Sequence, residues 1–251
     1  MHPFSSTNKP EFKLYGVNAA RSVFARRPEA VIRAYLEHRL LDSFRNELKG
    51  LALRKRAYHL VEAAELEKIT ESAHHEGVCL IVEDELPLSP EQFIETLKPG
   101  APCVLLALPD VGNPHNLGAI TRTAAHFGVG AILLKDAGKL KSGAALRTAS
   151  GGFEHVKVVE AESWEGALAT LAQAGFELVA TSSHAERDLY AAKLKPRTLF
   201  ALGAEGEGLA EGWLEAAAQV LKIPGTGLVE SLNVSVAAGV LLAEYFRQSR
   251  R

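Results

Sequence analysis

Cysteine and methionine are scarce in this chain. It has two cysteines, Cys79 and Cys103, and one methionine in 251 residues. Both cysteines lie inside apolar runs, where a free thiol packs as a small hydrophobic side chain, so a disulfide framework is not expected. No Cys, His and carboxylate set stands at zinc-ligand spacing, and the adjacent His74 and His75 fit a surface loop better than a metal site.

Long apolar runs are also absent. The longest mainly apolar run near the C-terminus, Val234 to Ala243, is much shorter than the ~20 residues that a membrane helix needs. The N-terminus lacks the charged and then apolar pattern of a secretory signal. Hydrophobic residues make up 47% of the chain and charged residues 23%, which is ordinary for a globular protein. We therefore expect a cytoplasmic protein that is not in a membrane.

The net charge of -2 hides a division along the chain. Residues 1–56 hold 12 Lys and Arg against 5 Asp and Glu, whereas residues 57–100 hold 2 against 10. A local basic excess favours a polyanion such as RNA. A solvated surface whose charge is cancelled by the acidic segment explains the same excess, and the sequence leaves both interpretations open.

The first third of the chain predicts a small α/β domain over residues 13–84, after a loose tail at 1–12. The residue patterns predict strands at 31–36, 58–61 and 78–82, and helices at 16–25, 40–53 and 63–72. Prolines and Gly100 mark residues 85–100 as a linker, with a short helix at 90–97.

A second domain is expected over residues 101–251. Apolar strands at 103–108, 131–134, 156–159, 177–181, 198–202 and 219–223 are separated by helical patterns at 117–127, 164–174, 209–217 and 232–247. Strands buried on both faces and separated by helices form a parallel sheet. Ligands bind beyond the carboxyl ends of such strands, where three motifs stand.

The first motif runs from Asn113 to Ala124. Asn116 precedes the predicted helix, so its side chain either caps the first turn or takes part in catalysis. Arg122 falls on the second predicted turn, where the helix dipole does not favour a cation. An RNA phosphate suits a guanidinium, which binds it with two parallel hydrogen bonds. A surface salt bridge is the alternative.

The second motif is the glycine-rich loop from Leu202 to Leu209. Its glycines stand at 203, 206 and 208, a spacing that differs from the dinucleotide-binding pattern. Glu205 and Glu207 would repel a pyrophosphate at the following helix. The loop therefore favours a cofactor that carries a positive charge and no phosphate.

The third motif leads from Ile223 through a Pro- and Gly-containing loop to Ser231, Leu232 and Asn233. Ser231 either caps the next helix or takes part in the functional site. Asn233 either pairs with backbone groups or takes part in the functional site. Small residues over 235–239 predict a tightly packed helix, in the core or at a dimer interface.

In this order and spacing, the motifs resemble those of the SpoU (TrmH) family of RNA ribose 2'-O-methyltransferases, in the SPOUT class. The resemblance implies an α/β fold whose C-terminal parallel-sheet domain has a trefoil knot and follows a small α/β RNA substrate-binding domain. Residues 13–19 and 74–78 resemble that first domain, and residues 147–152 resemble a family segment near the site. The implied activity is methyl transfer from S-adenosylmethionine to a ribose 2'-hydroxyl of tRNA or rRNA, by a homodimer without metal.

The resemblance also implies which residues form the site. The catalytic candidates are Asn116, Arg122, Glu205, Ser231 and Asn233. The cofactor candidates are Leu202, Gly203, Glu205, Gly206, Ile223, Leu232 and Asn233. Because arginine is hard to deprotonate, we expect Arg122 to orient phosphate and ribose and to stabilise charge rather than to act as a base.

Two alternatives remain at this point. An RNA-binding module without turnover would have the same fold, although the five intact catalytic candidates argue against it. A nucleotide-dependent oxidoreductase would need a different glycine pattern and an acidic residue ~20 positions later, which the chain lacks.

Overall fold

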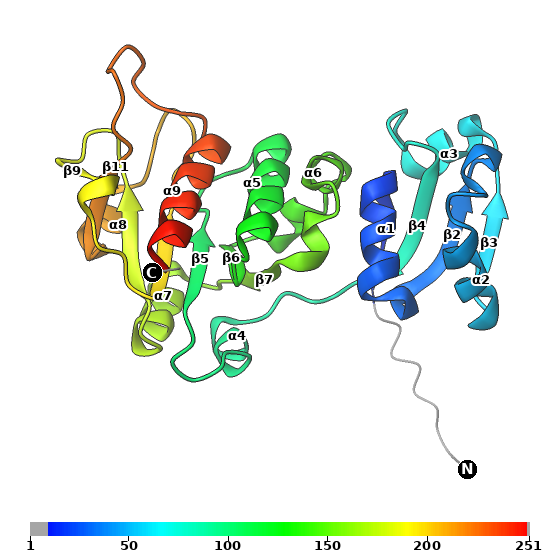
Figure 1. Cartoon of the computed structure of the whole chain (residues 1–251), viewed down its shortest axis with the longest axis horizontal. Coiled ribbons are helices and arrows are strands. Elements are labelled where there is room, and N and C mark those ends of the chain that lie inside the picture. The colour runs from blue at the N-terminus through cyan, green and yellow to red at the C-terminus, as the bar shows by residue number, and fades with distance from the viewer. Residues whose placement is uncertain (1–9, 250–251) are drawn as a thin grey trace. The chain divides into compact units, whose positions relative to one another are not determined.

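The computed structural model describes residues 10–249, and the chain divides into two units at Leu86 and Pro87 (Figure 1). Residues 1–9 of the expected loose tail lie outside the described range. Glu11 and Phe12, which the sequence placed in that tail, belong instead to a strand. The tail prediction was wrong for these two residues because strand pairing overrode the polar, proline-containing context.

The first unit is a four-stranded mixed sheet in the order β1 (Glu11–Tyr15), β4 (Val78–Glu83), β2 (Val31–Leu36) and β3 (Ala57–Leu60). β4 is antiparallel to both β1 and β2, and β2 is parallel to β3. Three helices accompany it: α1 (Val17–Arg26), α2 (Arg45–Leu53) and α3 (Ala63–Thr70). Buried residues of α1 and α2 share one core cluster with the sheet, and α3 belongs to a smaller cluster.

The helix expected over 40–53 is shorter than predicted. It begins at Arg45, after a 3-10 turn at His38–Leu40. The Ser43 hydroxyl donates to the carbonyl of Leu40, and Asp42 pairs with Arg45. Such local side-chain bonds offer the backbone an alternative to helix, which explains the late start.

The second unit contains a seven-stranded sheet in which every pairing is parallel. This confirms the predicted α/β class. The strand order is β7 (Lys157–Glu160), β6 (Ala131–Leu134), β5 (Cys103–Ala107), β10 (Arg197–Ala201), β8 (Glu177–Thr181), β11 (Gln219–Lys222) and β9 (Arg187–Asp188).

Helices cover both faces of this sheet. Buried residues of α5 (Pro114–Phe127), α6 (Gly143–Ala149) and α9 (Val234–Ser249) share one core cluster. Those of α4 (Pro90–Glu95), α7 (Trp164–Gln173) and α8 (Glu211–Ala216) share another. α9 lies beside α5, as Figure 1 shows, with Gly239 facing Thr123. One side of the helix of small residues is thus packed within its own chain.

Residues 87–100, the greater part of the expected linker, pack on the second unit. Leu88 forms a parallel bridge to Val159, accepting a backbone hydrogen bond from Glu160 and donating one to Val158. Phe93 on α4 is buried in the core. In the part of the chain that is described, no helix is both long and apolar enough to cross a membrane.

Candidate active site

The three motifs follow β5, β10 and β11, at the carboxyl ends of parallel strands. β5 and β10 are neighbours, while β8 separates β10 from β11. The backbone N–H of Leu202, which opens the second motif, donates to the carbonyl of Ala107 at the end of β5 over 3.0 Å. The topology therefore brings the first two motifs to adjacent positions on one edge of the sheet.

In the first motif, the helix begins earlier than the sequence analysis expected. Pro114 occupies its first position, and the Asn113 side chain caps it by accepting from the backbone N–H of His115 at 2.9 Å. The capping role considered for Asn116 is therefore wrong, because Asn116 lies inside the first turn. The dipeptide Asn113-Pro114 marks the true start of this helix in the sequence, since proline is favoured at the first helical position.

The earlier start also moves Arg122. It is the ninth residue of α5 and lies on the third turn, not the second. It stands about 9 Å along the axis from Asn116 and about 120° around it. Arg122 is exposed, and within residues 10–249 it forms no ion pair. The alternative of a surface salt bridge inside the chain is therefore not observed.

Two glycines allow close packing against α5. A Cβ at Gly118 would lie 2.5 Å from the carbonyl oxygen of Ala145, and one at Gly152 would lie 2.9 Å from the Cα of Arg122. The Thr148 hydroxyl lies 3.4 Å from Nδ1 of His115. Residues 147–152, which resemble a family segment near the site, are thus fixed against the helix that carries Asn116 and Arg122.

The second motif closes into a tight loop at the end of β10. Gly208 donates its backbone N–H to the carbonyl of Ala204 at 3.0 Å, and Gly206 has a positive φ of 88°. A Cβ at Gly203 would overlap the backbone carbonyl of Gly208, so no side chain fits there. The loop leaves Glu205 exposed beyond the strand.

In the third motif, Asn233 directly precedes α9. Its Oδ1 accepts hydrogen bonds from the Ser235 backbone N–H at 2.9 Å and from the Ser235 hydroxyl at 2.5 Å. Ser231 lies three residues before the helix, so the capping role considered for it is wrong. The backbone pairing considered for Asn233 is observed, so Asn233 rather than Ser231 caps the start of α9.

Asn233 connects all three motifs. Its Nδ2 donates to Oδ1 of Asn116 at 3.0 Å and to Oε1 of Glu205. The orientation of the amide is fixed, because the Ser235 backbone N–H can only donate and so Oδ1 must face it. Both N–H bonds of the amide then point at the other two motifs. Three of the five catalytic candidates therefore form one hydrogen-bonded group.

The other candidates form no side-chain hydrogen bond with this group within the described residues. Leu202 is buried in the core and Ile223 packs against that core, so they offer backbone rather than side chain. Ser231 and Gly206 are exposed, and Leu232 is 43% exposed. Within residues 10–249, neither Arg122 nor Ser231 is joined to Asn116, Glu205 or Asn233.

The second motif fits a cationic cofactor. Its ionisable side chains are Glu205 and Glu207, both exposed. No basic residue lies in the loop from Gly203 to Gly208 to offset them. A pyrophosphate would meet two carboxylates there, whereas the sulfonium of S-adenosylmethionine would not be repelled. Among the described residues, no group of three or more His, Cys, Asp or Glu side chains is arranged to hold a metal ion.

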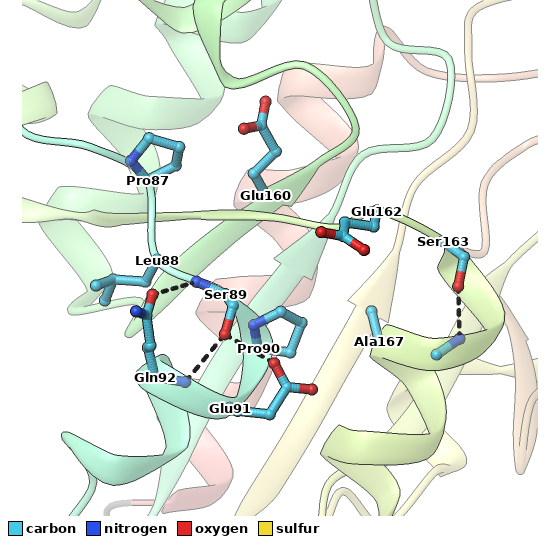
Figure 2. A pocket seen from close by; sticks show the side chains of 11 residues that line it. Pro87, Leu88, Ser89, Pro90, Glu91, Gln92, Glu160, Glu162, Ser163 and Ala167 are labelled. Atoms are coloured by element: carbon cyan, nitrogen blue, oxygen red, sulfur yellow. Dashed lines mark hydrogen bonds between the residues drawn. The ribbon is translucent and has the colours of Figure 1, made fainter.

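A cavity of about 430 Å³ lies elsewhere in the second unit, between the start of α4 and the start of α7 (Figure 2). Figure 2 shows Ser89 and Gln92 turned toward each other in the capping box of α4. Three carboxylates also line the cavity, those of Glu91, Glu160 and Glu162. None of the three motifs contributes a residue to this cavity, so we do not place the site there.

Comparison with known proteins identifies the family of the chain. Residues 103–243 match the SpoU rRNA Methylase family, and residues 13–87 match the RNA 2'-O ribose methyltransferase substrate-binding family. The chain belongs to the SpoU rRNA methylase family. The predicted class, an RNA ribose 2'-O-methyltransferase, is thereby confirmed, and the oxidoreductase alternative finds no support.

Individual relatives agree with this assignment. The chain is 40% identical over 240 residues to an uncharacterized tRNA/rRNA methyltransferase, YfiF, of Escherichia coli O157:H7, covering 96% of this chain and 69% of the relative. It is 33% identical to the 23S rRNA (guanosine-2'-O-)-methyltransferase RlmB of Vibrio vulnificus, covering 94% and 96%. A solved RNA 2'-O ribose methyltransferase superposes with a TM-score of 0.78 at 28% identity, covering 97% and 90%.

Proposed function

We propose that this protein transfers the methyl group of S-adenosylmethionine to a ribose 2'-hydroxyl of tRNA or rRNA. The observation that carries this proposal is the pair of hydrogen bonds from Asn233 to Asn116 and Glu205, which unites the three motifs. Family membership supplies the reaction class, and relatives named for tRNA or rRNA methylation supply the substrate class. A cytoplasmic location is part of this proposal.

The cofactor, when bound, supplies an electrophilic methyl group on a sulfonium. Gly203, Gly206 and Ile223 offer backbone groups to hold it, together with Leu202 and Leu232. Glu205 and Asn233 act mainly as positioning residues. The hydrogen bonds of Asn233 hold Asn116 and the Glu205 carboxylate in fixed positions, and correct alignment of reacting atoms accounts for much of the rate in such transfers.

Arg122 is the residue that we assign to the substrate. It is exposed and has no acidic partner among the described residues, so its five N–H donors are available to a phosphate. Bound there, the guanidinium orients the ribose and stabilises negative charge as the 2'-hydroxyl loses its proton. Ser231 lies in the loop leading to Asn233 and contacts the same ribose in this scheme.

The domain roles are part of the proposal. Residues 13–84 bind RNA, and residues 101–251 perform the transfer. Some of the basic excess is neutralised locally, because Arg39 pairs with Glu37 and Arg45 with Asp42. Other cations remain exposed for RNA, namely Arg21, Arg26, Arg33, Lys49, Arg54 and Lys55.

We also propose that the protein forms a homodimer and that its second unit contains a trefoil knot. Exposed apolar residues flank Asn233: Leu228 at 88%, Val229 at 72% and Val236 at 51% exposure. A second copy would cover them, since large apolar side chains clustered on a surface mark an interaction site. Light scattering after size-exclusion chromatography tests the dimer, and a mass near 27 kDa would contradict it.

The activity test uses S-adenosylmethionine with a tritiated methyl group and bulk RNA. Label in the RNA that survives alkaline treatment as a resistant dinucleotide identifies ribose methylation. No transfer, with RNA still bound, would favour the alternative of a binding module without turnover. Mapping of ribose methylation in cells with and without the protein then identifies the nucleotide.

A further inference from the structure

One side of the first unit's sheet carries an exposed basic and aromatic patch, formed by Arg33, Tyr35 and His59. Side chains alternate between the two faces of a strand. Ala34 and Leu36 on β2 point into the core shared with α1 and α2. Arg33 and Tyr35 therefore point to the opposite face. There Arg33 is exposed and Tyr35 is partly buried.

The aromatic members of the patch are already arranged as a stack. Tyr35 and His59 are direct partners in the pairing of β2 with β3. Their ring centroids lie 5.2 Å apart, with 20° between the ring planes. Tyr35 is held in place because it packs against the cluster of Tyr15, Val61, Leu66 and Cys79. His59 is exposed on β3, which is the edge strand of the sheet. The stack is thus anchored at Tyr35 and open beyond His59.

Arg33 adds a cation beside this stack. Its Nη1 donates to the Tyr35 hydroxyl at 3.2 Å, which fixes the guanidinium next to the ring. Within residues 10–249 the Tyr35 hydroxyl is the hydrogen-bonding partner of Arg33, so most N–H donors of the guanidinium remain available. Glu11 also attracts Arg33 electrostatically, but no ion pair joins the two. A fixed cation next to an open aromatic face suits one kind of ligand, a base joined to a phosphate.

We propose that this patch binds an unpaired nucleotide of the RNA substrate, with the base stacked on the outer face of His59 and the phosphate on Arg33. The proposal rests on the proposed function, which makes RNA the substrate of this unit. An unpaired base is required because bases within a duplex are stacked on one another, whereas splayed bases stack on aromatic side chains. The methylated nucleotide itself remains in the second unit.

The test measures RNA affinity of the full-length protein by fluorescence anisotropy. The probes are a labelled single-stranded 12-mer RNA and a duplex of the same length. We expect His59→Ala to weaken single-strand binding roughly 5- to 150-fold, the range for loss of one base–aromatic stack. His59→Phe should retain most of the affinity. Arg33→Gln should weaken binding and lower its salt dependence by about one phosphate contact.

Tyr58→Ala is the matched control. Tyr58 is the neighbouring aromatic residue on β3, is 41% exposed and points to the other face of the sheet, so its loss should leave single-strand affinity unchanged. Wild-type affinity in both His59→Ala and Arg33→Gln would overturn the patch, as would a wild-type preference for the duplex. Neither result would contradict the proposed methyl transfer by the unaltered protein. Absence of any transfer to RNA would instead overturn the proposed function.

Discussion

Asn233 donates a hydrogen bond to Asn116 across 3.0 Å, although 117 positions separate the two residues in the chain. The same amide group donates to Glu205. One side chain at the start of α9 therefore sets the relative positions of the first turn of α5 and the loop after β10. Its own orientation is set by Ser235. This dependence makes Asn233 the most direct place to test the site.

Replacing Asn233 with Asp should nearly abolish turnover while keeping the fold. The carboxylate still accepts the backbone N–H of Ser235, so α9 can begin normally. It loses both donors and places a negative charge beside Glu205. We expect single-turnover methyl transfer to fall by about 100-fold, the cost of a small misplacement of reacting groups. Gln173→Glu adds the same charge at an exposed position of α7 and should have no effect. Near-normal rates in Asn233→Asp would contradict the positioning role.

Removing the Arg122 guanidinium should affect turnover rather than folding. Arg122→Ala should leave thermal stability and cofactor affinity nearly unchanged and lower the rate by orders of magnitude. Arg122→Lys should recover little, because an ammonium cannot reproduce a planar two-pronged contact with phosphate. Single-turnover assays at saturating RNA and cofactor measure this directly. Arg187→Ala, another exposed arginine of the same unit, serves as the control. Full activity in Arg122→Ala would end the assignment.

S-adenosylhomocysteine should stabilise the protein, and Gly203→Ala should abolish that effect. Ligand at 100 times its dissociation constant adds about 2.7 kcal/mol to the free energy of unfolding. A Cβ at Gly203 would overlap the backbone of Gly208, so the second motif must change shape. A Cβ at Gly212 on α8 meets no atom within 4 Å, and Gly212→Ala should keep the shift in melting temperature. Equal shifts in both variants would argue against a cofactor at this loop.

The proposed division of labour predicts the behaviour of two truncated proteins. Residues 87–251 should bind S-adenosylhomocysteine and lose most RNA affinity, because the exposed cations of the first unit are gone. Residues 98–251 should be less stable, since the cut also removes buried Phe93. Loss of such a side chain costs about 3–5 kcal/mol. Thermal unfolding and RNA titration at several salt concentrations measure both effects. Unchanged RNA affinity of residues 87–251 would refute the division.

The two thiols should be unreactive in the folded protein. Burial raises the pKa of Cys79 to about 12, and it also raises the pKa of Cys103. The thiolate is the reactive form, so both groups should react slowly with a disulfide reagent at pH 8 and quickly after unfolding in guanidinium chloride. The raised pKa also means that these groups favour the folded state below their unfolded pKa, and that this contribution is lost as the pH rises toward 12. Rapid reaction of the native protein would contradict this.

Most strands of the second unit were predictable from sequence because they are buried on both faces. The apolar run Ala131–Leu134 and the mainly apolar segment Glu177–Thr181 correspond to strands with the same bounds. The carboxyl ends of these strands were therefore located well enough to place the motifs on one edge. β1 was missed, since its outer residues are exposed and its pairing with β4 is remote in sequence.

The meeting of Asn116, Glu205 and Asn233 could not be derived from local pattern. Each residue has a plain local role in sequence, as a cap or a loop residue, and only the strand order brings them together. The errors at Asn116 and Ser231 have one cause, which is that helix starts were placed on the first apolar residue. Asn113 with Pro114, and Asn233 with Ser235, mark the true starts. α6 was not predicted from the sequence.

The order of the three motifs along the chain has a consequence for synthesis. The ribosome makes the chain from its N-terminus, and domains fold as units as they emerge. The first turn of α5 and the loop after β10 emerge before Asn233, whose amide links them. A nascent chain that has not reached residue 233 therefore lacks the group that unites the site. We expect such an incomplete molecule to methylate RNA poorly.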